Sequence, residues 1–169
     1  MENRFDIKPY PAFNEVFADD ELKGVFYPLC TVVDKEKHKN KTFHFISSNG
    51  LWMNEAFETK VNTAQYTVFD LENDKYRFKG NLKLYNGFEQ AKLIFPILEE
   101  DFEKNGENCL KNKTKTDQYI KERKTVLNEN LMTDFIGQVM GDEFFTDGND
   151  TILFYDKTNE RIICLNFYS

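Results

Sequence analysis

The tightest constraint on the fold is a pair of apolar alternations on either side of a short polar turn. In QYTVFDLE (65–72) and KYRFKGNLKLY (75–85), apolar and polar residues alternate with a period of two around ENDK. That period is typical of strands with one buried face, and two such runs around a polar turn predict a hairpin. We therefore expect a fold that is built on antiparallel sheet.

Two further strands are predicted before this hairpin. GVFYPLCTVVD (24–34) has the composition of a buried strand, in which Pro28 must occupy a strand end or a bulge. TFHFI (42–46) places its two phenylalanines on one face and His44 on the other, which we expect to face solvent. AFNEVF (12–17) has the spacing of a short helix.

The pattern becomes helical after residue 98. Residues 99–140 contain two apolar stripes at helical spacing: Tyr119, Ile120, Arg123, Val126 and Leu127, then Leu131, Met132, Phe135, Ile136, Val139 and Met140. Residues 150–169 return to strand, with a turn at 157–160. This order predicts a single α+β domain over residues 1–169, with a mainly antiparallel sheet. Strands fill the N-terminal two-thirds, a helical segment covers about 99–140, and a β-hairpin closes the chain.

Composition narrows the environment and the partners. Of the 169 residues, 40% are hydrophobic and 15% aromatic, which is enough for a core without disulfides or a structural metal. A net charge of −7 argues against binding to DNA or RNA. The widely spaced Cys30, Cys109 and Cys164 predict reduced and mostly buried thiols. The first residues, MENRFDIKPYPAF, contain no signal-peptide core, and no run is long enough to span a membrane, so the expected location is the cytoplasm.

No motif for catalysis, metal binding or cofactor binding is present in the sequence. The two histidines, His38 and His44, have no partner at metal-ligand spacing. A GxSxG turn, a P-loop and a GxGxxG loop are all missing. The remaining nucleophilic alternative is a Cys30/His44 pair. The sequence therefore predicts no catalytic, cofactor-binding or metal-binding residues and no cofactor, and it favours a non-enzymatic function.

The stretch FFTDGNDTILFYD (144–156) is the one segment that resembles a cation loop. Three oxygen-bearing side chains surround Gly148, namely Asp147, Asn149 and Asp150. An EF-hand with Gly148 as its sixth residue would need oxygen ligands where Phe145 and Phe154 stand, so the EF-hand interpretation fails. A polar turn is the favoured interpretation. A looser calcium site and a partner contact are the alternatives.

Charge is segregated along the chain. Residues 99–107 and 142–150 each carry a net charge of −4, and residues 111–124 carry +4. In an acidic protein the basic segment is favoured as a solvated helical face, and phosphate binding is its alternative. Trp52 follows a flexible Asn-Gly and is interpreted either as a core residue or as an exposed contact anchor.

These features favour a protein-binding module that covers a basic partner. Bacterial immunity proteins, which neutralise a toxin by covering its active site, share this profile, although no motif connects the chain to a family. Acidic clusters would speed association with a basic partner by electrostatic steering. The predicted partner-binding residues are Trp52, Asp142, Glu143, Phe144, Phe145, Asp147 and Asp150.

The alternative function is a small-ligand-binding or hydrolytic domain with an aromatic-lined pocket. That alternative requires Asp70 or Glu72 to lie beside His44 in a cavity with convergent polar groups. A third hypothesis, nucleic-acid binding through residues 111–124, requires one coherent basic face.

Overall fold

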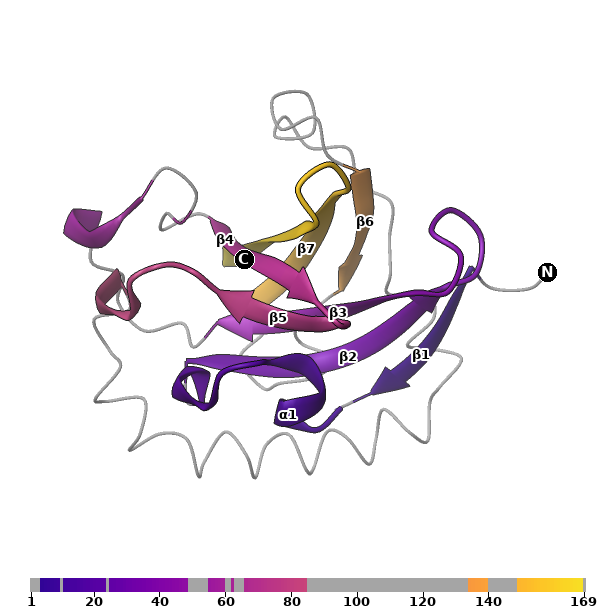
Figure 1. Ribbon diagram of the computed structural model, residues 1–169, viewed down its shortest axis with the longest axis horizontal. Coiled ribbons are helices and arrows are strands. Elements are labelled where there is room, and N and C mark those ends of the chain that lie inside the picture. Colours follow the sequence, from indigo (N-terminus) through magenta and orange to yellow (C-terminus); the bar gives the residue numbers. More distant parts are fainter. Residues whose placement is uncertain are drawn as a thin grey trace.

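The computed structural model describes residues 4–9, 11–23, 25–48, 55–59, 62, 66–84, 134–139 and 149–168. These residues form two antiparallel sheets and very little helix (Figure 1). The predicted antiparallel architecture is thus confirmed for this part of the chain, whereas helix makes only a minor contribution to it.

The first sheet has three strands in the order β1-β2-β3, which span Phe5–Pro9, Phe26–Asp34 and Lys41–Ser48. Both pairings are antiparallel. The register between β2 and β3 shifts between Pro28 and Cys30, so of the two positions expected for Pro28, a strand end or a bulge, the structure has the bulge. A proline cannot donate to the ladder, so a bulge is one of the few positions in a sheet that accept it.

The second sheet has five strands in the order β5-β4-β8-β7-β6. Its strands are β4 (Tyr66–Glu72), β5 (Lys75–Phe78), β6 (Asp134–Val139), β7 (Asn149–Asp156) and β8 (Arg161–Tyr168). The predicted hairpins β4–β5 and β7–β8 are both present, and β4 pairs with β8 to join them into one sheet.

The described helices are very short, with three or four residues each. They are α1 (Phe13–Val16), η1 (Asp20–Leu22), η2 (Glu55–Phe57) and η3 (Leu82–Leu84). The helix predicted at 12–17 is confirmed as α1. In the described ranges, no helix has the length and apolar character needed to cross a membrane.

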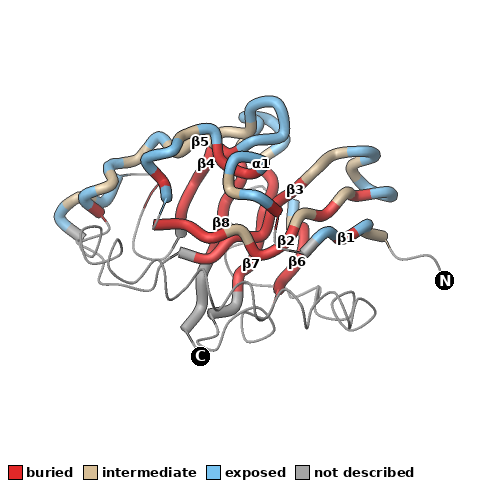
Figure 2. The backbone as a smooth tube through the Cα atoms, turned by 90° about the horizontal axis from the view of Figure 1, so that it is seen from below, coloured by how far each residue is buried: buried red, intermediate tan, exposed pale blue. Residues whose placement is uncertain are grey.

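The main core lies between the two sheets and is rich in aromatic rings. Phe26 on β2 packs edge-on against Phe69 on β4, with ring centroids 5.2 Å apart, and Phe69 stacks on Tyr76 at 5.4 Å. All three side chains are fully buried. Figure 2 shows the buried strands in the centre, with the exposed residues mostly in the turns and in the segment around α1. The high phenylalanine content of the sequence is therefore used to join the sheets.

The five-stranded sheet is apolar on both faces. Phe69, Leu153 and Ile162 belong to the main core, whereas their neighbours along the same strands form a second buried cluster. This second cluster contains Val68, Ile152, Phe154, Ile163 and Leu165, with Phe135 packed against it. Because successive side chains of a strand point to opposite faces, the two clusters lie on opposite sides of the sheet.

Two predictions of local structure are wrong. Residues 134–139 form β6 and not part of a helix, and residues 82–84 form η3 where the strand was expected to continue. In β6 a bulge between Phe135 and Gly137 breaks the period of two. Phe135 packs on the second cluster, whereas Ile136 and Val139 face the main core. The bulge thus produced an apolar spacing that resembles a helical stripe.

Candidate partner-binding surface

Most of the predicted partner-binding residues lie outside the described residues. These are Trp52, Asp142, Glu143, Phe144, Phe145 and Asp147. The backbone of Asp150 belongs to β7 and pairs with Phe167, but its side chain is not described. The surface that these residues were expected to form stays a prediction, and so do those made for Cys109 and residues 111–124.

His44 does not face solvent as expected. Its side chain is buried, and both ring nitrogens have partners: Nδ1 lies 2.8 Å from the Thr31 hydroxyl and Nε2 2.6 Å from the carbonyl oxygen of Asp74. Because a carbonyl can only accept, Nε2 carries the proton and Nδ1 accepts from Thr31. Burial lowers the pKa of His44, against the opposing effects of Asp74 and Glu15, so the ring is neutral at pH 7. The correction arises because the β4–β5 turn covers the face that alternation alone assigned to solvent.

The backbone of His44 is held by Tyr76. The His44 N–H donates to the Tyr76 hydroxyl at 2.6 Å, and that hydroxyl donates to the His44 carbonyl at 2.8 Å. Further along β3, the hydroxyl of Thr151 donates to the carbonyl of Ile46 at 2.8 Å. Side-chain hydroxyls from the second sheet therefore satisfy backbone groups on β3 that its pairing with β2 leaves unbonded.

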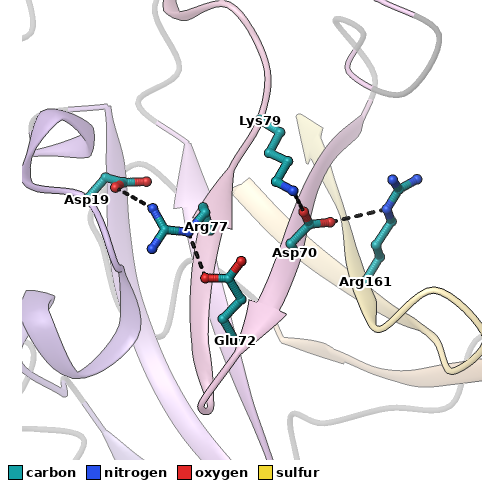
Figure 3. Close-up of polar contacts among 6 residues, drawn as sticks. All are labelled: Asp19, Asp70, Glu72, Arg77, Lys79 and Arg161. Carbon is teal, nitrogen blue, oxygen red and sulfur yellow. Dashed lines mark hydrogen bonds and ion pairs between the residues drawn. The ribbon is translucent and has the colours of Figure 1, made fainter.

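Asp70 and Glu72 belong to a network of ion pairs on the β4–β5 hairpin (Figure 3). Their partners in this network are Arg77, Lys79 and Arg161, and His44 is not among them. Asp70 lies between Lys79, at 2.5 Å, and Arg161, at 3.2 Å. Glu72 lies 2.8 Å from Arg77, and both ring nitrogens of His44 already have other partners, Thr31 and Asp74. The geometry required for the pocket with His44 is therefore not present.

Arg77 connects the hairpin to the segment after α1. Its guanidinium lies 2.8 Å from Glu72 and 3.1 Å from Asp19, and the hydrogen bond that Arg77 donates to Glu72 raises the pKa of Arg77 (Figure 3). The neighbouring Ala18 N–H donates to the Tyr76 carbonyl at 3.0 Å. The segment that contains η1 therefore lies along the outer edge of β5.

This contact brings Asp19 and Glu72 together around Arg77. Three more carboxylates neighbour these two along the chain, and we call the set of five the hairpin face: Asp19, Asp20, Glu21, Glu72 and Asp74. Arg77 forms ion pairs with Asp19 and Glu72. Asp20, Glu21 and Asp74 are exposed and form no ion pair with any described residue. Lys75 lies opposite Glu72 in the hairpin register without an ion pair among the described residues. The sequence pattern does not indicate this acidic surface, because Asp19 and Glu72 meet at Arg77 only in the folded chain.

A second polar cluster joins the β2–β3 turn to the β7–β8 hairpin. Glu160 accepts from Lys41 at 2.8 Å and from the Tyr155 hydroxyl at 2.7 Å. The same interactions with Lys41 and Tyr155 lower the pKa of Glu160. Burial alone would lower the pKa of Lys41, but its hydrogen bonds to Glu160 and Tyr155 outweigh burial and raise the pKa. Both shifts fix the charged forms, which suits a structural ion pair better than acid–base catalysis.

The thiols and histidines of the described residues form neither a nucleophile nor a metal site. Cys30 and Cys164 are buried outside any disulfide, and burial strongly raises the pKa of the Cys164 thiol, which keeps it protonated. The nitrogens of His44 are bound to Thr31 and Asp74, so the Cys30/His44 pair has no geometric support. No group of three potential metal ligands occurs within the ranges that the structure describes.

Comparison of the chain with protein-family models, with curated proteins and with solved structures finds no match. Functional inference therefore depends on the residues themselves.

Proposed function

We propose that this chain is a non-enzymatic protein-binding module that covers a basic partner through acidic surface. Its mode of action would be that of a bacterial immunity protein, which neutralises a toxin by covering its active site. The proposal needs an acidic surface with unneutralised charge and a scaffold that holds it in place. The hairpin face meets both requirements among the described residues.

One observation carries the proposal. Asp20, Glu21 and Asp74 are exposed without a counter-ion in the described structure, on two elements that the Asp19–Arg77–Glu72 bridge holds together. Such carboxylates raise the local negative potential and attract a cationic partner over several ångströms. Arg77 fixes the spacing of Asp19 and Glu72 and forms no ion pair with Asp20, Glu21 or Asp74.

The net charge of −7 supports the same interpretation. It would accelerate encounter with a basic protein and repel nucleic acid. The chemistry of the described residues also favours binding over catalysis, because the displaced carboxylate pKa values, those of Glu15, Asp34 and Glu160, all lie below the ordinary range. A general acid needs the opposite shift.

The proposal is tested with the tagged protein as bait in the producing cells, followed by affinity measurements with the partner recovered. Two sets of charge reversals separate the two acidic surfaces: Asp20→Lys with Glu21→Lys on the hairpin face, and Asp142→Lys with Glu143→Lys in the predicted one. We expect the first set to weaken binding at least tenfold, about 1.4 kcal/mol, and to flatten its dependence on salt.

Glu36→Lys is the matched control, because Glu36 is an exposed acid on the β2–β3 turn and lies outside the hairpin face. It should change affinity only slightly. If the first set and the control bind equally well, the hairpin face is not the contact surface. If neither set of reversals alters affinity, the proposal of an acidic binding surface fails.

A further inference from the structure

His44 and its partners form a joint between the two sheets, which we call the His44 joint: Thr31 on β2, His44 on β3, Asp74 in the β4–β5 turn and Tyr76 on β5. The ring of His44 packs edge-on against that of Tyr76, with centroids 5.0 Å apart. Four hydrogen bonds run through the joint, two to the ring and two to the backbone of His44.

The hydrogen bonds of the closed joint are those of a neutral ring, and burial is the main obstacle to protonating it. Nε2 donates to the Asp74 carbonyl, and Nδ1 accepts from the Thr31 hydroxyl. A proton taken from solvent onto Nδ1 would turn this acceptor into a donor and force the Thr31 hydroxyl to reverse. It would also place a charge on a side chain that is 3% exposed. Exposing the ring to water would solvate this charge and free the Thr31 hydroxyl. For the ring to be exposed, the β4–β5 turn must move away from β3.

The charged groups around the ring come from two elements. Glu15 on α1 and Asp74 in the β4–β5 turn both favour the protonated ring. Glu15 is itself paired with Lys8 at 3.0 Å, which reduces its influence. The Tyr76 phenol is fully buried and stays neutral, since burial raises its pKa far above the ordinary value. Burial of the His44 ring outweighs the two carboxylates, so the closed joint disfavours the proton.

We propose that the His44 joint is a pH-sensitive device, in which the neutral ring holds the β4–β5 hairpin closed on β3 and protonation releases it. Acidification would then open this hairpin locally before the molecule unfolds as a whole. Two backbone amides report on this local opening: the His44 N–H, which donates to the Tyr76 hydroxyl, and the Ala18 N–H, which donates to the Tyr76 carbonyl. Amides of the β7–β8 ladder report on global opening.

The experiment is amide hydrogen exchange by NMR between pH 7.5 and 5.0, corrected for the intrinsic pH dependence of exchange, together with titration of the His44 ring. Below a pH of about 6.5, the opening constant at the two reporters should rise by up to about tenfold per pH unit, with a smaller rise in the β7–β8 ladder. His44→Gln keeps a side-chain donor for Asp74 but cannot titrate, so its reporters should show no such rise. His38→Gln, the matched control, removes the other histidine and should leave the rise at the two reporters relative to the β7–β8 ladder in place.

Two results overturn the proposal: a folded-state pKa of His44 at or above its ordinary value, or reporters that respond to pH no more than the ladder does. The ring titration uses the unmodified protein, so it decides the question even if His44→Gln does not fold. The test involves no partner and is therefore independent of the proposed binding function.

Discussion

The hydroxyl of Tyr76 lies between the backbone N–H and carbonyl of His44, at 2.6 and 2.8 Å, and bonds to both. A single buried oxygen thus replaces the neighbouring strand that β3 lacks at this position. Since Tyr76 is on β5, the same contact fixes the distance between the two sheets.

Tyr76→Phe should be strongly destabilising. It removes the hydroxyl and leaves the N–H and carbonyl of His44 buried without partners, each at a loss of roughly 1–3 kcal/mol. The measurement is the free energy of unfolding from urea titration. Tyr155→Phe is the matched control, because the Tyr155 hydroxyl bonds to the exposed carboxylate of Glu160, which water can solvate instead. Equal losses in the two variants would contradict the role given to Tyr76.

Arg4→Met should destabilise by about 3 kcal/mol at pH 7, as the loss of a partner from a buried ion pair does. Arg4 Nε donates to the buried carboxylate of Asp34 at 3.1 Å. Burial alone would raise the pKa of Asp34, but the bonds from Arg4 and from two backbone N–H groups outweigh it and hold the pKa below 3.8.

The pH dependence of that loss has a definite sign. Because the folded-state pKa of Asp34 is lowered, its stabilisation is complete above about pH 4 and is lost as the pH falls through the folded value. The difference between wild type and Arg4→Met should therefore shrink below pH 4, as urea titrations at pH 7 and pH 3 would show. A constant difference would exclude Asp34 as the titrating partner.

Asp134→Asn should change the stability of the protein little at pH 7.5 and lower it increasingly below pH 6.5. His38 Nε2 lies 3.5 Å from the Asp134 carboxylate, but burial lowers the pKa of His38, so the pair is not ionic at neutral pH. On acidification the Asp134 carboxylate stabilises protonated His38. In Asp134→Asn the free energy of unfolding should therefore fall further than in the wild type, by up to about 1 kcal/mol. Urea midpoints at pH 7.5 and 5.5 measure this loss. Asp6→Asn is the control, since Asp6 pairs with a lysine, Lys35, and not with a histidine.

Gly80→Ala should lower stability by about 1–3 kcal/mol through overpacking. A Cβ at this position would clash with Cζ of Phe78, whose ring packs against those of Phe26 and Phe69, with centroids 5.7 and 5.9 Å away. Thermal unfolding should show a drop of about 2–4 °C for each kcal/mol in a chain of this size. In a double-mutant cycle, Phe78→Leu should reduce the effect of Gly80→Ala. Additive losses would show that the ring is not the obstacle.

The hairpins could be predicted from sequence because each strand and its turn are contiguous. Alternation around ENDK and the polar residues 157–160 indicated β4–β5 and β7–β8, and the exclusion of Pro28 from a regular ladder indicated its bulge. These predictions use only local chemistry, which a single sequence contains in full.

The joints between elements could not be predicted in the same way. Alternation correctly put His44 opposite the two phenylalanines of its strand, but it contains no information that the turn at Asp74 covers that face. The hairpin face likewise depends on Asp19 meeting Arg77, which is 58 residues away in the sequence. In β6, the bulge between Phe135 and Gly137 gave a strand the apolar spacing that is typical of a helix.

The ion pair between Lys41 and Glu160 joins residues that are 119 positions apart, and the bond from Thr151 to Ile46 spans 105. Contacts of this kind contribute nothing until most of the chain has already been brought together, and chains dominated by them fold in milliseconds to seconds. Refolding followed by stopped-flow fluorescence should accordingly be slow for a protein of 169 residues. The pairing of β4 with β8, which joins residues 91 to 99 positions apart, adds to the same delay.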